Sequence, residues 1–293
     1  MRSLLITGAS GFLGWHASHL LAPAWQIHGT YHTHPVAIAA GSVSQLDLNH
    51  DAEVQACWDQ INPSAVLHTA AASKVNRCQQ DPESSYRVNV TGAVKLAERC
   101  AAARIPFLFT STDLVFDGTQ APYAETDVPS PINHYGQQKA TAESRILAAY
   151  PDATICRLPL LYGAATPTAN CFLQGFLAAI AEDKPLTLFT DEIRTPAAVT
   201  DVIQGLSLVL EQGITGILHL GGPESINRYE FGLRMAAAFN FSARFLIPCL
   251  QASVSLPAPR PKDVSLNSQK AFGLGYAPRA VDIALRAIAE QTG

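Results

Sequence analysis

Near the start of the chain stands Ser3-Leu4-Leu5-Ile6-Thr7-Gly8-Ala9-Ser10-Gly11-Phe12-Leu13-Gly14, an apolar run that leads into a glycine-rich turn. A short apolar run bounded by glycine is typical of a buried parallel strand. A helix is predicted over Trp15–Ala22, and Pro23 ends it. When strand, glycine turn and helix follow in this order, the loop amides and the helix N-terminus face a pyrophosphate. The pattern therefore predicts a dinucleotide-binding site.

Each glycine of the turn has its own role in such a site. Gly8 allows the tight turn, Gly11 lets the phosphates approach the backbone, and Gly14 lets the helix pack closely on the strand. The alternative is an ordinary turn between a strand and a helix. The position near the N-terminus, with Thr7 ahead of the glycines, favours dinucleotide binding.

The second predicted strand, Gln26–Thr30, ends in a segment that bears on the choice of cofactor. A site for NAD usually has an acidic residue here for the ribose hydroxyls, whereas a 2′-phosphate is bound by cationic or neutral donors. The segment contains His32, Thr33 and His34 but no acid. It favours NADP(H) over NAD(H), with one of these side chains near the phosphate. The other interpretation is a solvated loop.

Strands and helices alternate through the first half of the chain. The elements predicted next are a strand ending at Leu46–Leu48, a helix over Asp51–Gln60, a strand over Ala65–Ala72, a helix over Ser84–Ala103 and a strand over Pro106–Thr110. This alternation predicts an α/β fold with a Rossmann-like, doubly wound parallel sheet. Such sheets bind their ligands at the carboxyl ends of the strands.

The pattern loosens after about residue 150, where prolines interrupt shorter elements. We expect an NAD(P)-binding domain over residues 1–150 and a smaller, mainly substrate-binding lobe over 151–293, with segments near 151–163 and 197–222 returning to the main sheet. The lobe is predicted to contain helices over Cys171–Glu182 and Ala197–Glu211, a strand over Leu186–Thr190, and a strand and turn over Ile217–Gly222. The proline-rich Leu250–Asp263 is expected to form a loop that covers the cleft.

Composition narrows the classes of partner. The 293 residues are 48% hydrophobic with a net charge of −4, so neither a nucleic acid nor an anionic membrane is expected as a partner. No apolar stretch reaches the roughly 20 residues of a membrane span. The six cysteines are scattered and form no metal-like cluster with the histidines. We expect a cytoplasmic protein without a bound metal.

Tyr135 and Lys139 lie four residues apart on a predicted helix, so their side chains share a face. A phenol with a pKa of about 10 is a poor proton donor at neutral pH, but a cation beside it lowers that pKa. Thr112, at the end of the preceding strand, can hold a carbonyl oxygen next to the phenol. The three side chains predict a general acid with an orienting partner, and the alternative is a surface pair that occurs by chance.

Six motifs, in order along the chain, carry a resemblance to a known family. They are Thr7-Gly8-x-x-Gly11-x-x-Gly14, Ser111-Thr112-Asp113-x-Val115-Phe116-Asp117-Gly118, Tyr135-x-x-x-Lys139, Arg157-Leu158-Pro159-Leu160-Leu161-Tyr162-Gly163, Asp191-Glu192-x-Arg194-Thr195-Pro196 and Arg260-Pro261-x-x-x-x-Leu266-Asn267. Nearly the whole chain resembles an extended short-chain dehydrogenase/reductase, and within it the dTDP-4-dehydrorhamnose reductase group. It also resembles the regulatory β subunit of methionine adenosyltransferase.

The resemblance implies a role for individual residues. Tyr135 would protonate the C4 oxygen of a sugar while hydride arrives from the nicotinamide, Lys139 would bond the nicotinamide ribose, and Thr112 would hold the keto oxygen. The implied cofactor-binding residues are Gly8, Gly11, Phe12, Leu13 and Gly14 at the pyrophosphate, Asp47 and Leu48 at the adenine, and Ala70, Ala71 and Ala72 in a strand-end loop.

The substrate side is assigned to the strand end and to two arginines. Asp113 adjoins Thr112 and is grouped with it. Arg194 and Arg260 flank prolines in predicted loops and are candidates for a substrate diphosphate, because a guanidinium grips phosphate oxygens in a fork. For each arginine the alternative is a structural salt bridge.

Three positions depart from the family's pattern. His16 stands where members that bridge subunits through magnesium have a glutamate, which argues against a metal. Asn267 stands where an aspartate is usual, and Thr69 where an asparagine often precedes the alanines. These changes leave the catalytic set intact and the exact substrate open.

The leading hypothesis is the NAD(P)H-dependent reduction of the C4 keto group of a nucleotide-linked 4-keto-6-deoxy sugar, as in dTDP-rhamnose biosynthesis. The alternatives are a regulatory NADP-binding subunit similar to the methionine adenosyltransferase β subunit, and a nucleotide-sugar epimerase. A dehydratase is disfavoured. Dehydratases of this fold have a sequence similar to Thr-Asp-Glu at the strand end, where the glutamate serves as an acid. Here Leu114 follows Asp113, and a leucine cannot shuttle a proton. The oligomeric state, a homodimer included, is left open.

Overall fold

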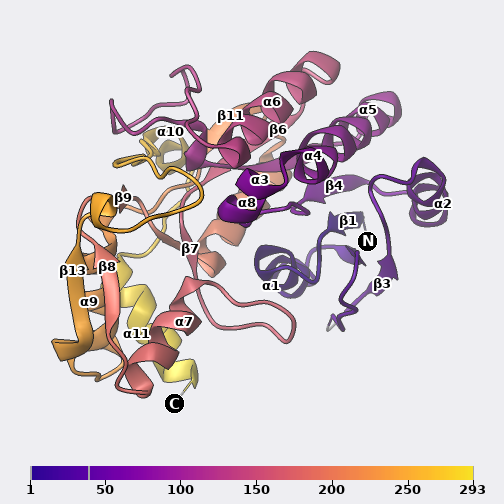
Figure 1. The fold of residues 1–293 in the computed structure, drawn as a ribbon. Coiled ribbons are helices and arrows are strands. Elements are labelled where there is room, and N and C mark those ends of the chain that lie inside the picture. Colours follow the sequence, from indigo (N-terminus) through magenta and orange to yellow (C-terminus); the bar gives the residue numbers. More distant parts are fainter. Residues whose placement is uncertain (1, 39, 293) are drawn as a thin grey trace.

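A seven-stranded sheet, parallel throughout, forms the centre of the computed structural model, which describes residues 2–38 and 40–292 (Figure 1). Its strands are β1 (Ser3–Thr7), β2 (Gln26–Tyr31), β3 (Ser42–Gln45), β4 (Ala65–His68), β5 (Phe107–Thr112), β6 (Thr154–Leu158) and β11 (Gly216–His219). Their order in the sheet is β11-β6-β5-β4-β1-β2-β3. The strand order reverses between β1 and β4, the place where such sheets bind their ligands. The predicted α/β class and doubly wound parallel sheet are confirmed.

Helices cover both faces of this sheet. They are α1 (Phe12–Leu20), α2 (Asp51–Ile61), α3 (Val75–Gln80), α4 (Pro82–Tyr86), α5 (Ala93–Ala103), α6 (His134–Ala149) and α8 (Val199–Gln212). Leu4 and Ile6 of β1 pack in one apolar cluster with α1 and α8, whereas Leu5 packs in another with α5 and α6. Successive strand residues point to opposite faces, so an apolar run is what a strand covered on both sides requires.

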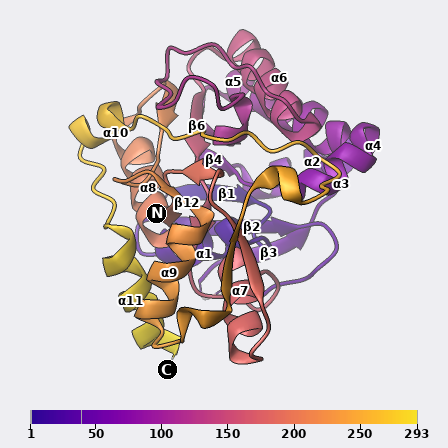
Figure 2. The same ribbon diagram turned by 60° about the vertical axis from the view of Figure 1, so that its left-hand side comes forward.

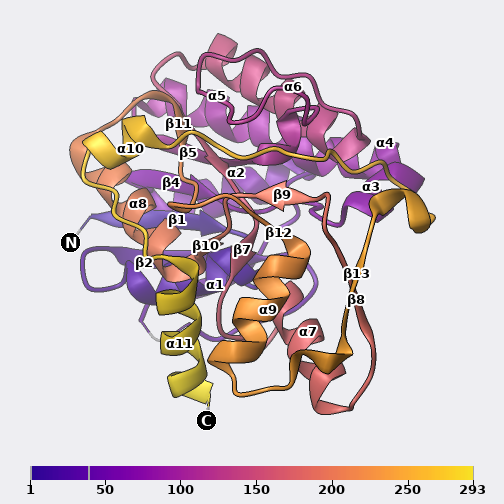
Figure 3. The ribbon, with the colours of Figure 1, turned by 90° about the vertical axis from the view of Figure 1, so that its left-hand side faces the viewer.

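A smaller lobe is built from the second half of the chain (Figures 2 and 3). Its elements are β7 (Leu161–Tyr162), α7 (Phe172–Ala181), β8 (Leu186–Phe189), β9 (Ile193–Arg194), β10 (Ala197–Ala198), β12 (Ile226–Asn227), α9 (Arg228–Ala238), β13 (Leu246–Cys249) and α11 (Val281–Thr292). The short α10 (Gln269–Gly273) packs on β11 of the main sheet instead. A separate apolar cluster joins α7, α9 and α11 to β8 and β13. The smaller C-terminal lobe is therefore confirmed, and β6 and β11 belong to the main sheet.

The division of the chain at residue 150 stays a prediction, and the end residues 1 and 293 of the two predicted ranges lie outside the described residues. No helix within the described ranges is long and apolar enough to cross a membrane.

Several predicted elements differ from those observed: α1 begins at Phe12 and not at Trp15, and the strand predicted over Ala65–Ala72 ends at His68. The strand expected to end at Leu46–Leu48 lies earlier, at β3, because the polar Ser42–Gln45 pairs with β2 at the sheet edge. Leu46 and Leu48 are buried beyond its end against α2. The helix expected over Ser84–Ala103 is three consecutive pieces, with a π-helical turn at Arg87–Gly92 between α4 and α5.

Candidate functional site

Two cavities adjoin at the carboxyl ends of the main-sheet strands. The first has a volume of about 530 Å³ and is lined by residues at and after the ends of β1, β2, β4 and β5. The second, of about 590 Å³, is also lined by α7, β8 and β9 of the small lobe. Thr112 and Tyr135 line both cavities. A molecule bound in one cavity would therefore meet a molecule bound in the other at these two side chains.

Every residue that the sequence assigned to the cofactor lines the first cavity. These residues are Gly8, Gly11, Phe12, Leu13, Gly14, His32, Asp47, Leu48, Ala70, Ala71, Ala72, Tyr135 and Lys139. Thr112 lines it as well, together with Ser10, which the sequence did not single out, and Thr69, which was noted as a departure from the family's pattern. The tertiary structure thus gathers the whole predicted set around one space.

The glycine turn fits a dinucleotide because it leaves no room for side chains. Gly8 has φ of +74°, and a Cβ there would lie 2.8 Å from backbone atoms of Ala70. A Cβ on Gly14 would lie 2.2 Å from the Gly8 carbonyl oxygen, so only glycine lets α1 approach β1 this closely. The exposed backbone of the turn and the N-terminus of α1 at Phe12 present the amide groups that can bind a pyrophosphate.

The Ala70–Ala72 loop is held in place by the π-helical turn. Asn89, a buried residue of that turn, accepts a hydrogen bond from the Ala72 amide at 2.8 Å and donates to the Ala72 carbonyl at 3.1 Å. Its amide nitrogen also lies 2.8 Å from the Gln138 side-chain oxygen on α6. π-Helical turns often occur at functional sites. Here the turn links the strand-end loop to the helix that carries Tyr135 and Lys139.

An acid reaches the end of β2 from the neighbouring strand. Asp47, which follows β3, lies 3.7 Å from His32 Nε2. A hydrogen bond from the Asn49 amide, with smaller contributions from His32 and His50, holds the pKa of Asp47 below its usual range. The sequence showed no acid directly after β2, but the parallel pairing of β2 with β3 brings this carboxylate to the same place.

Tyr135 and Lys139 lie in the first turns of α6, which begins where Asn133 caps it by accepting the Gly136 amide at 2.9 Å. Lys139 is buried, with its ammonium 3.8 Å from the centre of the Phe109 ring. Burial lowers the pKa of Lys139 to about 7.

The sequence predicted that Lys139 lowers the pKa of Tyr135, and this prediction is wrong. Burial raises the pKa of Tyr135, and the nearby Cys78 and Asp113 raise it further. The ammonium of Lys139 faces the Phe109 ring instead of offsetting this burial. The phenol therefore keeps its proton at neutral pH.

Thr112 and Asp113 form the junction between the cavities. The Thr112 hydroxyl donates to Asp113 Oδ1 at 3.1 Å and accepts the Leu114 amide at 3.2 Å, which caps the short 3₁₀ turn Asp113–Val115. Burial raises the pKa of Asp113, and Arg194 opposes this shift.

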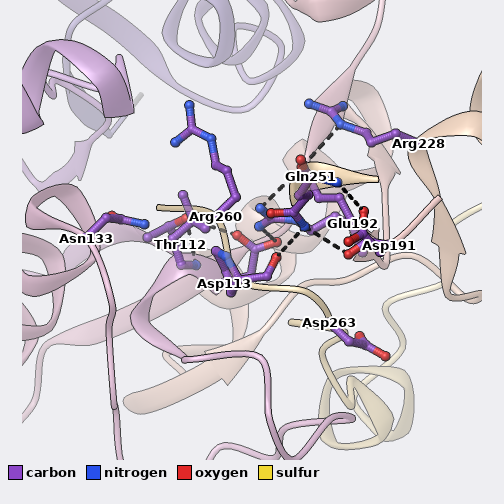
Figure 4. A network of polar contacts seen from close by, with 12 residues as sticks. Thr112, Asp113, Asn133, Asp191, Glu192, Arg228, Gln251, Arg260 and Asp263 are labelled. Atoms are coloured by element: carbon purple, nitrogen blue, oxygen red, sulfur yellow. Dashed lines mark hydrogen bonds and ion pairs between the residues drawn. The ribbon is translucent and has the colours of Figure 1, made fainter. Parts of the chain in front are cut away.

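A cluster of charged side chains lines the second cavity (Figure 4). Arg194 lies 2.9 Å from Asp113 and 3.4 Å from Glu192. The Nε of Arg228 lies 3.3 Å from the same Glu192 carboxylate. Arg260 lines this cavity too, so three arginines and two carboxylate residues line it.

These arginines have donors to spare. Within residues 2–38 and 40–292, Arg194 Nε, Arg228 Nη1 and Arg260 Nη1 are buried without a hydrogen-bond partner. A buried donor without a partner is costly, and a phosphate would satisfy several at once. The structural salt bridge considered for Arg194 is present, and its unpaired Nε still leaves it able to bind an anion.

Leu256 and Arg260 of the segment Leu250–Asp263 line the second cavity, and Figure 3 shows this part of the chain crossing from β13 to α10. It contains only a short 3₁₀ turn at Gln251–Ser253. Arg260 donates to Asn76 of α3 at 3.0 Å, and the Pro259 carbonyl accepts from Asn133 at 3.3 Å. These contacts join the segment to the sheet domain at the start of α6.

Sequence reasoning missed Arg228 and gave Glu192 no role. Arg228 is the first residue of α9, which Asn227 caps by accepting the Glu230 amide at 2.8 Å. The signal in the sequence that could have identified Arg228 was its position directly after Asn227, a residue type that often caps a helix. The apolar Phe172 and Phe176 of α7, which line the same cavity, were also missed.

His16 is buried, and its Nε2 lies 3.0 Å from the Ala164 carbonyl oxygen. Burial lowers the pKa of its imidazole. No group of three or more potential metal-binding side chains occurs in the part of the chain that the structure describes.

Comparison with known proteins adds a family and a fold. The model of the family described as RmlD substrate binding domain matches residues 1–292. A relative from Haloferax volcanii, the probable low-salt glycan biosynthesis reductase Agl14, is 30% identical over 272 residues, which cover 92% of this chain and 90% of that protein. Methionine adenosyltransferase 2 subunit beta from Mus musculus is 29% identical over 286 residues, which cover 95% and 84%.

Two solved structures share the fold over nearly their full lengths. The dTDP-4-dehydrorhamnose reductase of Bacillus anthracis, in complex with NADP, has a TM-score of 0.88 at 23% identity, covering 99% of this chain and 100% of that one. The UDP-glucose 4-epimerase of Thermus thermophilus, in complex with NAD, has a TM-score of 0.85 at 22% identity, covering 99% and 98%.

Proposed function

The chain belongs to the RmlD substrate binding domain family, and we propose that it is an NADP(H)-dependent reductase of the C4 keto group of a nucleotide-linked 4-keto-6-deoxy sugar. One observation carries this proposal: Tyr135 and Thr112 line both cavities, with Lys139 one helical turn away. This arrangement supports a reaction between a molecule in the first cavity and a molecule in the second.

The residues suit the addition of hydride and a proton to a ketone. A bound nicotinamide cofactor supplies the hydride. Tyr135, whose pKa is raised, holds a proton at neutral pH and gives it to the keto oxygen, so that the ketone becomes an alcohol. Thr112 orients this oxygen once its hydroxyl turns from Asp113. Lys139 is buried at the wall of the first cavity, where its ammonium can donate a hydrogen bond to a ribose hydroxyl of the cofactor.

The second cavity supports a nucleotide sugar as substrate. The spare donors of Arg194, Arg228 and Arg260 suit the two phosphates of a nucleotide diphosphate. The rings of Phe172 and Phe176 offer apolar faces on which a base can stack.

The preference for NADP(H) rests on His32, an exposed side chain at the mouth of the first cavity. Asp47 lies close enough to pair with His32 and so works against a 2′-phosphate. We expect a higher kcat/KM with NADPH than with NADH. The substitution His32→Ala should reduce the ratio of these two kcat/KM values. An unchanged ratio in the variant would remove His32 from the cofactor assignment.

The test is oxidation of NADPH, and separately of NADH, on addition of dTDP-4-keto-6-deoxy-L-mannose. We expect turnover, and a loss of about 10²- to 10⁴-fold in Tyr135→Phe with cofactor binding retained, the usual contribution of a general acid. Tyr150→Phe is the matched control, because its hydroxyl bonds the Ile105 carbonyl outside both cavities. Equal rates in Tyr135→Phe and wild type would refute the role of Tyr135.

Two other functions have specific support. The methionine adenosyltransferase β relatives favour a regulatory subunit, which would bind cofactor, turn over no keto sugar and co-purify with a synthetase. The epimerase structure favours epimerisation, which would appear as catalysis without net consumption of cofactor.

A further inference from the structure

A chain of buried polar side chains lies next to Lys139 and takes no direct part in the proposed reaction. Its members are Ser111 on β5, Glu143 on α6, Arg157 on β6 and His219 on β11, each at most 5% exposed. Burying two opposite charges is costly, and apolar side chains of the same volume often serve stability as well. The network therefore calls for an explanation beyond packing.

Glu143 is clamped from two neighbouring strands. Arg157 Nε lies 3.1 Å from both carboxylate oxygens, and Nη2 lies 2.7 Å from one of them. The Ser111 hydroxyl donates a further hydrogen bond to the carboxylate. With these donors in fixed positions, the carboxylate has one orientation and stays buried.

His219 holds the other end of Arg157. Burial and the charge of Arg157 lower the pKa of His219 to about 3, so the ring is neutral. Its Nε2 lies 3.3 Å from Arg157 Nη1 and accepts that hydrogen bond. The Nδ1–H then donates to the Tyr123 carbonyl at 3.1 Å, which assigns the tautomer.

Lys139 and Glu143 are four residues apart on α6 and share its buried face. Burial removes water from the Lys139 ammonium and favours its neutral form, whereas the charge of Glu143 favours the ammonium. The other titratable groups nearby do not replace Glu143. His68 on β4 is neutral, because burial lowers its pKa to about 3. Cys78 on α3 and Asp113 act on Tyr135.

We propose that Glu143 is a positioning residue for Lys139: held by Arg157 and Ser111, its fixed carboxylate favours the ammonium form of Lys139 near neutral pH. The consequence for catalysis rests on the proposed function, in which Lys139 donates to the cofactor. The electrostatic part does not, because it concerns only side chains of this chain.

The direct test is the titration midpoint of Lys139, followed by NMR on protein with isotope-labelled lysine and assigned by loss of the signal in Lys139→Met. We expect Glu143→Gln to lower this midpoint by about one pH unit, since removing one charge at the distance of a helical turn has an effect of this size. Glu143→Asp keeps the charge, so its Lys139 midpoint should lie close to that of the wild type.

A control variant separates a specific effect from loss of net charge. Glu98→Gln removes the same charge from the exposed side of α5 and should leave the Lys139 midpoint unchanged. In the assay of keto-sugar reduction, the alkaline fall of kcat/KM should move to lower pH in Glu143→Gln and stay in place in Glu98→Gln. A purely structural role would lower the rate at all pH values without moving this fall.

Glu143→Gln leaves Arg157 buried without its partner and risks unfolding. The double variant Glu143→Gln/Arg157→Met leaves no unpaired buried charge, and it should lower the midpoint by less than the single variant, because the charge of Arg157 opposes that of Glu143. A midpoint unchanged in a folded variant would overturn the proposal. A shifted midpoint in a protein that reduces no keto sugar would uphold it and refute the proposed function instead.

Discussion

Arg228 illustrates how a single side chain acquires its role from its surroundings. It begins α9, pairs with Glu192, and lies with its guanidinium carbon 4.5 Å from the centre of the Phe172 ring. Burial lowers the pKa of Arg228, and the charge of Glu192 opposes this shift. The guanidinium nevertheless stays charged at any ordinary pH. One of its nitrogens still lacks a partner among the described residues.

At this scale we predict that Arg228→Gln raises the KM for a nucleotide sugar by roughly 10- to 100-fold, the usual worth of a charge-assisted hydrogen bond. The dissociation constant for NADPH should not change, because Arg228 lines only the second cavity. Steady-state kinetics and a fluorescence titration with NADPH measure the two quantities. Arg244→Gln, at an exposed position of the same lobe, is the control. Equal KM values in both variants would remove Arg228 from the substrate site.

At the scale of elements, the close packing of α1 on β1 depends on Gly14. An added Cβ would lie 2.2 Å from the Gly8 carbonyl oxygen and 2.7 Å from the Thr69 hydroxyl oxygen. Backbone atoms cannot move aside as a flexible side chain does, so the helix itself would have to shift. The turn that lines the first cavity would shift with it.

Gly14→Ala should therefore lower the free energy of unfolding by about 3 kcal/mol and weaken NADPH binding, as overpacking in a closely packed interior does. Gly175→Ala makes the same change in α7, where nothing lies within 4 Å of the new Cβ. That variant should gain about 0.5–1 kcal/mol, because alanine favours a helix. Urea unfolding of both proteins measures the difference. Similar losses in the two would contradict the steric explanation.

At the scale of the whole molecule, buried histidines link stability to pH. The pKa of His68 and of His219 is about 3 in the folded protein, against 6.5 for an ordinary histidine. Between these values only the unfolded chain binds the proton. Unfolding is thus favoured as the pH falls from about 6.5 toward 3, and the stability that these groups contribute is present above that window.

Each of these histidines should add about 1.4 kcal/mol per pH unit to the acid loss of stability. We predict that His219→Gln, which cannot take up a proton, has a slope shallower by about that amount between pH 6 and pH 4. Urea unfolding at several pH values measures the slopes. Parallel slopes in variant and wild type would show that His219 takes up its proton equally in the folded and unfolded chains.

The sequence by itself determined the features that depend on neighbours along the chain. Residues 3–22 predicted strand, turn and helix, because a buried apolar run and three spaced glycines restrict the backbone locally. The spacing of Tyr135 and Lys139 placed both side chains on one face of α6, since helical periodicity is a local property. The alternation of strands and helices was enough to predict the doubly wound sheet.

Only the tertiary structure decided what surrounds these groups. It brought Asp47 beside His32 from the next strand, and Arg228 beside Glu192 from another part of the small lobe. It also reversed the expected direction of the Tyr135 pKa. The physical reason is common to all three: desolvation and charge pairing depend on which segments pack together, and no local pattern of residues specifies that.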